Sequence, residues 1–131
     1  MSGDTVSGQQ TVYGSASGTI IASGGEELVA SGATASATTV NSGGLEEVFG
    51  TANAITVSSG SQDYILSGAA TAVSSGGLQV VGSGASATGA TVSSGGQDYI
   101  VSGGVASGAK VLSGGIETVF GTCLLYTSRC V

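Results

Sequence analysis

The amino-acid sequence predicts an all-β protein, a right-handed parallel β-helix (β-solenoid) of about 6–7 coils with 16–19 residues in each. The first observation behind this prediction is a repeat. The tripeptide Ser-Gly-Gly, or a variant that differs in one residue, recurs in steps of 19, 17, 16, 19 and 19 residues. A period close to 20 residues that contains several strand-like pieces is typical of solenoids. The six tripeptides begin at Ser23, Ser42, Ser59, Ser75, Ser94 and Ser113.

The second observation is that β-branched aliphatic residues keep a fixed register with these tripeptides. When each serine is counted as position 0, such a residue stands at position +6 and another at position −2 in all six repeats. Small branched side chains suit a thin core between stacked strands. The residues at position +6 are Val29, Val48, Ile65, Val81, Ile100 and Val119. Those at position −2 are Ile21, Val40, Val57, Val73, Val92 and Val111.

The third observation is the composition of the 131-residue chain, which contains 25 Gly and no Pro. The inner strands of a solenoid use their N–H groups in ladders with both neighbouring coils, and proline has no N–H to donate. Glycine suits the tight corners between strands, where a positive φ is needed. Hydrophobic residues make up 40% of the chain, which argues against a disordered segment.

Within one coil the elements are expected in a fixed order. Positions −4 to −1 form a short strand, Ser-Gly-Gly forms a corner, and positions +3 to +7 form a second strand. A second corner that contains glycine follows, and the remaining Ala, Ser and Thr residues form a loop or a weak third strand. The coils of 16 and 17 residues are expected to be shortened in this last segment. Strands this short need neighbouring coils, stacked about 4.8 Å apart, for stability. The right-handed winding is expected from the usual handedness of crossover connections.

Two segments are expected along the chain. Residues 1–122 form the repeat segment, which we interpret as a fragment of a longer protein because the chain opens inside a degenerate repeat. Residues 123–131 hold both cysteines and the only arginine, and they contain no glycine. The stretch Cys-Leu-Leu-Tyr-Thr-Ser in this tail is similar to the translation of a transposon-end adapter used for sequencing libraries. We therefore expect a non-native tail, and a disulfide loop between Cys123 and Cys130 is the alternative.

The charge and the residue types of the chain limit which classes of partner and which reactions are expected. A net charge of −6, with only two basic residues, disfavours nucleic acid and anionic membrane surfaces as partners. Histidine is absent, so acid–base and nucleophilic catalysis have almost no suitable residues. We expect no enzyme activity, no cofactor and no metal site. No apolar run has the length of a membrane-spanning helix, and no signal peptide is visible.

Position +4 carries an acidic residue in five of the six repeats and a glutamine in the other. Stacking would align these side chains in a column. Because burial of several carboxylates would be very costly, we expect the column to face solvent. Three interpretations stay open: solvated charge that keeps the rod soluble, a surface stripe that binds a cation or a partner, and a catalytic carboxylate pair. The residues at position +4 are Glu27, Glu46, Asp63, Gln79, Asp98 and Glu117.

A solvent-facing column conflicts with the buried position +6, because positions +4 and +6 of a flat strand point to the same side. We therefore expect a bend or a bulge between them. Position +5 includes Tyr64 and Tyr99, which are either exposed contact residues for a glycan or a second rod, or ordinary strand residues. Repulsion between the acidic columns of two rods would oppose self-association, so acid and salt are expected to promote it.

The unit Ala-Thr-Val-Ser-Ser-Gly-Gly-Gln-Asp-Tyr-Ile-Val-Ser-Gly-Gly, at residues 90–104, resembles the 19-residue repeats of the AIDA-type (diffuse-adherence, self-associating) autotransporter adhesins of Gram-negative bacteria. The resemblance covers residues 4–122. It implies a right-handed β-helix that forms part of a secreted passenger, held at the cell surface by a C-terminal outer-membrane barrel of the parent protein. The 16- and 17-residue coils depart from the 19-residue unit of the family.

The resemblance also implies a function. Members of the family mediate cell–cell aggregation, biofilm formation and host attachment, which implies like passengers, and host glycans or proteins, as partners. An inert stalk that presents a separate adhesive tip is the alternative for this segment. Some members carry heptose on Ser or Thr near the junctions of strands and corners. The matching positions here are Ser23, Ser42, Ser59, Ser75, Ser94 and Ser113.

Overall fold

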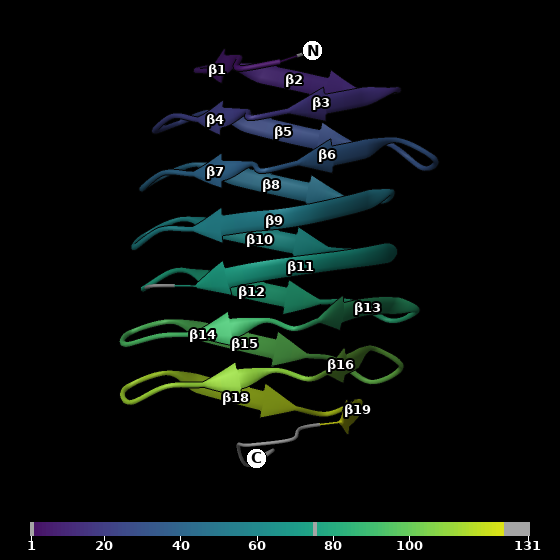
Figure 1. Ribbon diagram of the computed structural model, residues 1–131, viewed down its shortest axis with the longest axis vertical. Coiled ribbons are helices and arrows are strands. Elements are labelled where there is room, and N and C mark those ends of the chain that lie inside the picture. The colour runs from purple at the N-terminus through teal and green to yellow at the C-terminus, as the bar shows by residue number, and fades with distance from the viewer. Residues whose placement is uncertain (1, 75, 125–131) are drawn as a thin grey trace.

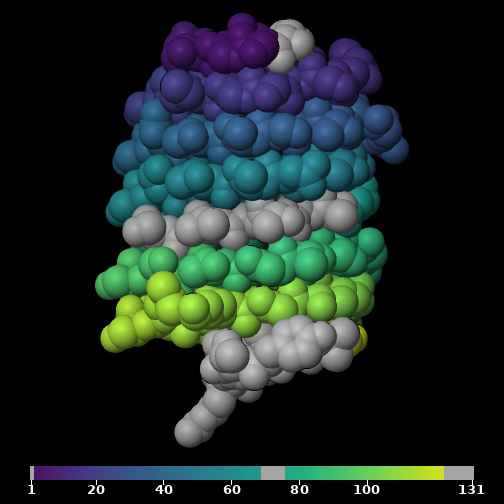
Figure 2. Space-filling model, in the orientation of Figure 1, coloured from purple at the N-terminus to yellow at the C-terminus, as the bar shows by residue number. Residues whose placement is uncertain are grey.

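The computed structural model describes residues 2–74 and 76–124, which form a parallel β-solenoid without a helix. Figure 1 shows the coils stacked along the longest axis of the molecule, from the N-terminus at one end to the C-terminus at the other. Figure 2 shows the same coils as bands that lie across the rod. The predicted solenoid is therefore confirmed, whereas its right-handed winding stays a prediction.

One face of the rod is a seven-stranded parallel sheet made from positions +3 to +6 of each coil. All seven strands have four residues, and they pair without a shift in register. The flat strand alternates outward and inward side chains along its length. In spatial order the strands are β2 (Gln9–Val12), β5 (Glu26–Val29), β8 (Leu45–Val48), β10 (Gln62–Ile65), β12 (Leu78–Val81), β15 (Gln97–Ile100) and β18 (Ile116–Val119).

Two further faces belong to one twelve-stranded sheet, because β9 (Thr51–Val57) and β11 (Gly68–Ser74) each run along both faces. The segment expected to be a loop or a weak third strand is thus a strand. The face that precedes the Ser-Gly-Gly corner also contains β1 (Thr5–Val6), β4 (Ile20–Ile21), β7 (Thr39–Val40), β14 (Thr91–Val92) and β17 (Lys110–Val111). The Ala-rich face also contains β3 (Ser15–Ser17), β6 (Thr34–Ser36), β13 (Ala85–Thr88), β16 (Val105–Ser107) and β19 (Thr122–Leu124).

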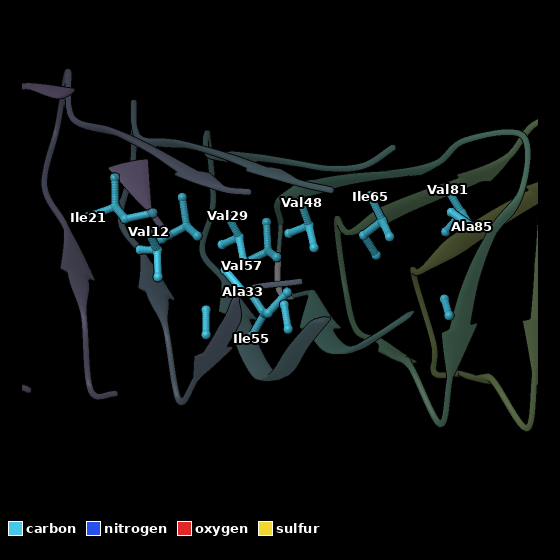
Figure 3. Packing of buried hydrophobic residues seen from close by; sticks show 14 of the residues in the cluster. Val12, Ile21, Val29, Ala33, Val48, Ile55, Val57, Ile65, Val81 and Ala85 are labelled. Carbon is cyan, nitrogen blue, oxygen red and sulfur yellow. The ribbon is translucent and has the colours of Figure 1, made fainter. Parts of the chain in front are cut away.

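The core is a narrow stack of Val, Ile and Ala side chains between the three faces, as Figure 3 shows from close by. Position +6 is buried in five coils and half-buried at Val119, and position −2 is buried in four coils and half-buried at Val111. The expected core place of Val73 is wrong in register, because Ser74 pairs with Val57 and Val92 of the neighbouring coils. Val73 pairs with Thr56 and Thr91, one position earlier, because this coil is shorter. Alanines from the third face, such as Ala35 and Ala106, close the core. Their small size permits the close approach of the three faces.

The Ser-Gly-Gly corners stack on one another with continuous backbone hydrogen bonds. In one of them Gly43 adopts a φ of 80°, a conformation that favours glycine. Its N–H donates to the carbonyl of Gly60 in the next coil at 3.0 Å. A side chain at Gly43 would also meet the hydroxyl of Ser23, whose Oγ would lie 2.9 Å from the added carbon. The corner therefore needs glycine for its conformation and for its contact with the preceding coil.

The second corner exists in a long and a short form, which corrects the expected place of the shortening. Between β5 and β6 the chain passes through four residues, 30–33, whereas between β8 and β9 it passes only through Phe49 and Gly50. The 17-residue coil thus loses two residues at this corner, not in the Ala/Ser segment. The 16-residue coil does lose one residue in that segment, where the pairing of β11 with β9 shifts between Ala70 and Ala72.

The first residues of the expected tail pair with the preceding coil. Strand β19 runs parallel to β16, with Cys123 opposite Ala106 and Leu124 opposite Ser107. Residues 125–131, and with them Cys130, lie outside the described residues. The non-native origin of residues 123–131 stays a prediction.

Candidate functional site

The acidic column predicted at position +4 exists, but it lies inside the rod. The expectation that it faces solvent as a surface stripe is wrong, because all six of its residues are buried. The in-register pairing of β2 with β5 adds Gln10 to the N-terminal end of the column. We call the whole set the internal carboxyl column, which consists of Gln10, Glu27, Glu46, Asp63, Gln79, Asp98 and Glu117.

The expected bend between positions +4 and +6 is absent from the described strands of this sheet. In β8, Glu46 and Val48 both point inward, while Leu45 and Glu47 are half-buried on the outer side. The regular alternation of a flat strand decides the placement, so the sheet geometry outweighs the cost of burying carboxyl groups. The column lies beside the aliphatic core instead of on the surface.

Two amide side chains of the column donate hydrogen bonds to carboxyl groups in the neighbouring coil. Gln10 Nε2 donates to Glu27 Oε2 at 3.2 Å, and Gln79 Nε2 donates to Asp63 Oδ2 at 3.2 Å. Gln79 also separates three carboxyl groups on its N-terminal side from two on its C-terminal side. An amide at this place therefore divides the column into two shorter runs of like groups.

Burial raises the pKa of every carboxyl group in the column. For Asp98, burial first, and then the charges of Glu117 and Asp63, raise the pKa to about 7. Burial raises the pKa of Glu46 well above its ordinary value, and the carboxyl groups of Asp63 and Glu27 add to the rise. Burial likewise raises the pKa of Asp63, against the lowering effect of the hydrogen bond from Gln79.

The pKa values of Glu27 and Glu117, the first and last carboxyl groups of the column, are also raised. Burial raises the pKa of Glu27, the hydroxyl groups of Thr19 and Thr38 lower it in part, and the charge of Asp4 raises it. Burial alone raises the pKa of Glu117. The protonated, neutral form of each carboxyl group is thus favoured inside the rod.

The interior placement changes what the column can do. Solvated surface charge and contact with a macromolecular partner both require exposure, so the burial of the column contradicts these two roles, whereas cation binding and a catalytic carboxylate pair stay predictions without a test. Within residues 2–74 and 76–124, no group of three or more His, Cys, Asp or Glu side chains is arranged to hold a metal ion.

The exposed side of the same seven-stranded sheet is rich in apolar residues. Tyr64 and Tyr99 are half-buried there, two coils apart in one column with Val80 between them. Position +3, which the sequence analysis did not single out, adds three aliphatic residues to this side. We call the set the apolar outer face, which consists of Leu28, Leu45, Tyr64, Leu78, Val80, Tyr99 and Ile116.

Aromatic residues extend the apolar outer face to the corner that follows three of the seven strands. Tyr13, Phe49 and Phe120 occupy position +7 in three of the four corners that contain two residues, and their side chains are 82%, 38% and 71% exposed. Each precedes a glycine, so the pair aromatic-Gly marks the short corner in the sequence. The pair Tyr13-Gly14 could therefore have identified a short corner in the coil before the first Ser-Gly-Gly.

The outer side of the Ala-rich face is different, because hydroxyl groups predominate on it. In β6, for example, Thr34 and Ser36 point outward on either side of the buried Ala35. The five described serines among the predicted glycosylation positions are exposed at their corners, and they are Ser23, Ser42, Ser59, Ser94 and Ser113. Ser75 lies outside the described residues.

The surface hollows of the described residues contain few groups for chemistry. A cavity of about 270 Å³ lies over the corner between neighbouring coils, and Gln62, Leu78 and Gln97 line it together with Ser61 and glycines. Gln62, Leu78 and Gln97 are not titratable, and the hydroxyl group of Ser61 donates a hydrogen bond to the carbonyl of Ser58 at 2.6 Å. Within the described part of the chain, no helix is present that would be long and apolar enough to cross a membrane.

No family model matches the sequence, and no curated protein matches it. Among solved structures, the chain is similar to one described as the crystal structure of a TibC-catalyzed hyper-glycosylated TibA55-350 fragment. The sequence identity is 22%, the TM-score is 0.38, and the match covers 99% of this chain and 83% of that chain.

Proposed function

We propose that this chain is a segment of the rod of a surface-exposed, AIDA-type autotransporter passenger, and that it associates with like rods. Such association would serve cell–cell aggregation, biofilm formation or host attachment at the Gram-negative cell surface. The observation that carries the proposal is the apolar outer face, since seven of the fourteen outward residues of the seven-stranded sheet are aliphatic or aromatic. A uniformly polar surface would favour an inert stalk instead.

The size of this face suits a weak contact that is repeated along a long rod. Seven strands spaced about 4.8 Å apart, each with four residues at about 3.3 Å, cover roughly 400 Å², and the apolar outer face supplies half of the outward residues in this area. A stable interface needs about 800 Å² from each partner, so one segment of this length would bind weakly. Several such segments in one rod would bind together much more strongly, because the later contacts are intramolecular.

The surface charge of the rod also permits close approach. Of the eight acidic residues in the chain, five lie in the internal carboxyl column. The acidic residues on the surface of the described rod are Asp4, Glu26 and Glu47, and its basic residue there is Lys110. Long-range repulsion between rods is therefore small, in contrast to the acidic surface that the net charge of the chain suggests.

The test is light scattering and sedimentation of the protein over a range of concentration at neutral pH. The double variant Tyr64→Thr and Tyr99→Thr should lower association, because it removes the two aromatic side chains and keeps residues that suit a strand. Thr118 already occupies the same column, so threonine fits this position. The matched control is Thr39→Ser with Thr91→Ser on another face of the rod, which should leave association unchanged.

A protein that stays monomeric at all concentrations would contradict the proposal and support the stalk. Equal effects of the tyrosine and threonine variants would show that the contact does not use the apolar outer face. No catalytic role and no cofactor form part of this proposal.

A further inference from the structure

The internal carboxyl column contains more hydrogen-bond acceptors than donors. When all five carboxyl groups are ionised, only the amides of Gln10 and Gln79 can donate within the column. Both carboxyl oxygens of Glu46 and both of Asp98 are buried without a hydrogen-bond partner. Buried carboxylate oxygens without donors are very costly, so the column lacks donors that a stable folded rod requires.

The surroundings of Glu46 and Asp98 do not supply these donors or a compensating charge. The inner sides of the two other faces present Val, Ile and Ala side chains, together with the hydroxyl groups of Thr19 and Thr38 near Glu27. Asp4 is the charged group outside the column that acts on it, and its charge is also negative. Among the described residues, no basic side chain faces the column, since Lys110 is exposed on another face.

A proton on a carboxyl group supplies the missing donor. In-register pairing places the backbone of each column residue about 4.8 Å from that of the next. The flexible carboxyl and amide ends of neighbouring side chains can therefore reach each other to form a hydrogen bond. Asp63 Oδ1 and Gln79 Oε1 are buried acceptors without a partner, and Gln79 pairs in register with Asp98. A protonated Asp98 could donate to Gln79, whose amide already donates to Asp63.

We propose that the rod folds with this column in the neutral acid form, as a chain of carboxylic acid and amide groups that are hydrogen-bonded along the axis. Folding then takes up protons from solvent, and alkaline solution destabilises the rod. This coupling of folding to proton uptake follows from the burial of the column, from its in-register stacking and from its lack of hydrogen-bond donors. It goes beyond the proposed adhesive function, which depends on the outer side of the same sheet.

The direction of the pH dependence follows from the raised pKa values. Unfolded Asp and Glu lose their protons near pH 4, whereas burial holds the pKa of Asp98 at about 7 in the folded rod. The contribution of such a group to stability is therefore complete below about pH 4, and it is lost as the pH rises through about 7. A rod with exposed carboxylates would show no comparable loss over this range.

The experiment is urea unfolding of the full chain at a series of pH values from about 4 to about 9, followed by circular dichroism. The unfolding midpoint should fall as the pH rises, with a slope that corresponds to the uptake of at least about two protons on folding. Infrared spectroscopy of the folded protein at pH 6 should show the carbonyl band of protonated carboxyl groups, which disappears on unfolding. A midpoint that is flat over this range, or the absence of that band, would overturn the proposal.

A matched pair of variants on one strand separates the column from ordinary surface charge. Glu46→Gln replaces an inward carboxyl group with a neutral amide and should raise the midpoint at pH 8 but not at pH 5. Glu47→Gln makes the same chemical change on the outer side of β8 and should alter neither value by a similar amount. Equal effects of the two variants would contradict the proposal.

A bound cation is the other way to compensate buried carboxylates. Sodium, potassium or calcium chloride, each added at constant ionic strength at pH 8, should leave the unfolding midpoint unchanged if protons neutralise the column. Selective stabilisation by one of these cations would overturn the proposal. If the Glu46→Gln variant does not fold, the pH series and the infrared band of the unaltered protein still decide the question.

Discussion

Neighbouring residues of this rod experience opposite environments, because each short strand alternates between the core and the solvent. Glu46 and Glu47 are chemically identical, yet one carboxyl group lies in the core and the other on the outer side of β8. The same holds for Val80 and Val81 in β12. The effect of a substitution on stability should therefore depend more on whether the position points inward or outward than on the type of residue introduced.

Val81→Asp should strongly destabilise the rod. The side chain of Val81 is buried between Ile65 and Ile100 of the neighbouring coils, so an aspartate there would be without a partner. We expect a loss of about 3 kcal/mol or more in the free energy of unfolding at pH 7. Val80→Asp, on the outer side of the same strand, should cost less than about 1 kcal/mol in the same urea titration. Similar losses for the two variants would contradict the alternation described for β12.

Two alanines adopt a backbone conformation that other coils assign to glycine. Ala37 and Ala54 both have a φ of 56°, and Gly18, Gly89 and Gly108 occupy the equivalent place with positive φ. The left-handed conformation costs an L-residue about 1–2 kcal/mol, and glycine avoids this cost. Part of the gain is offset because glycine has a larger conformational entropy in the unfolded chain. Ala37→Gly should therefore raise the free energy of unfolding by about 0.5–1 kcal/mol.

Thermal unfolding measures this gain, and Ala35→Gly is its control. Ala35 lies two residues earlier and is buried in β6, where glycine would remove a packed methyl group and should destabilise the rod. A loss of stability for Ala37→Gly would show that the positive φ is not strained in this corner.

At the level of the element, the corners change the length of a coil while the seven-stranded sheet remains in register, and the 16-residue coil also loses one residue within β11. Three of the two-residue corners contain an aromatic residue and a glycine, whereas other corners contain up to four residues. In the short corner of the third coil, a side chain at Gly50 would clash with the carbonyl oxygens of Ala33 and Ala30 in the coil before it. Only a residue without a side chain permits the chain to turn so close to its neighbour.

Gly50→Ala should therefore destabilise the rod by about 1–3 kcal/mol, since the backbone atoms that it would meet cannot move aside cheaply. Gly14 is the equivalent glycine of the first described coil, and an added side chain there has no heavy atom within 4 Å. Gly14→Ala should change the melting temperature by no more than about 2 °C. Equal losses for the two variants would show that the clash with the preceding coil does not determine the need for glycine.

The strands and the core positions could be predicted from the sequence, whereas the placement of position +4 could not. The repeats of Val and Ile at positions −2 and +6 identify buried columns, because apolar residues in a fixed register have one physical explanation. The parity of Glu46 and Val48 also indicated a buried carboxyl group, but the cost of burying a fixed negative charge argued against it. Protonation removes most of that cost, and the sequence pattern alone does not report a raised pKa.

At the level of the whole molecule, the rod has sides of different character around a core of constant cross-section. The seven-stranded sheet presents seven apolar residues outward among Gln, Glu and Thr, and the Ala-rich face presents mainly hydroxyl groups. Charge is sparse on the described surface because most acidic residues lie inside. Contact between rods should therefore depend on apolar area instead of charge.

Self-association of the protein should respond little to salt. Electrostatic repulsion between weakly charged surfaces is small, so screening between about 0.05 and 0.5 M sodium chloride has little to remove. Light scattering at pH 7 should give association constants that agree within about a factor of two over this range. A steep increase with salt would indicate acidic repulsion between rods, as first expected from the net charge, and would contradict the interior position of the column.

The fixed spacing between paired strands also determines how the length of such a rod can change. A coil advances the axis by about 4.8 Å whether it contains 16, 17 or 19 residues, because the spacing between paired strands is fixed. Loss or duplication of one whole repeat in the gene would therefore shift the end of the rod by one fixed step. The remaining coils would meet the same kind of neighbour as before, so length can vary between related proteins without any new packing.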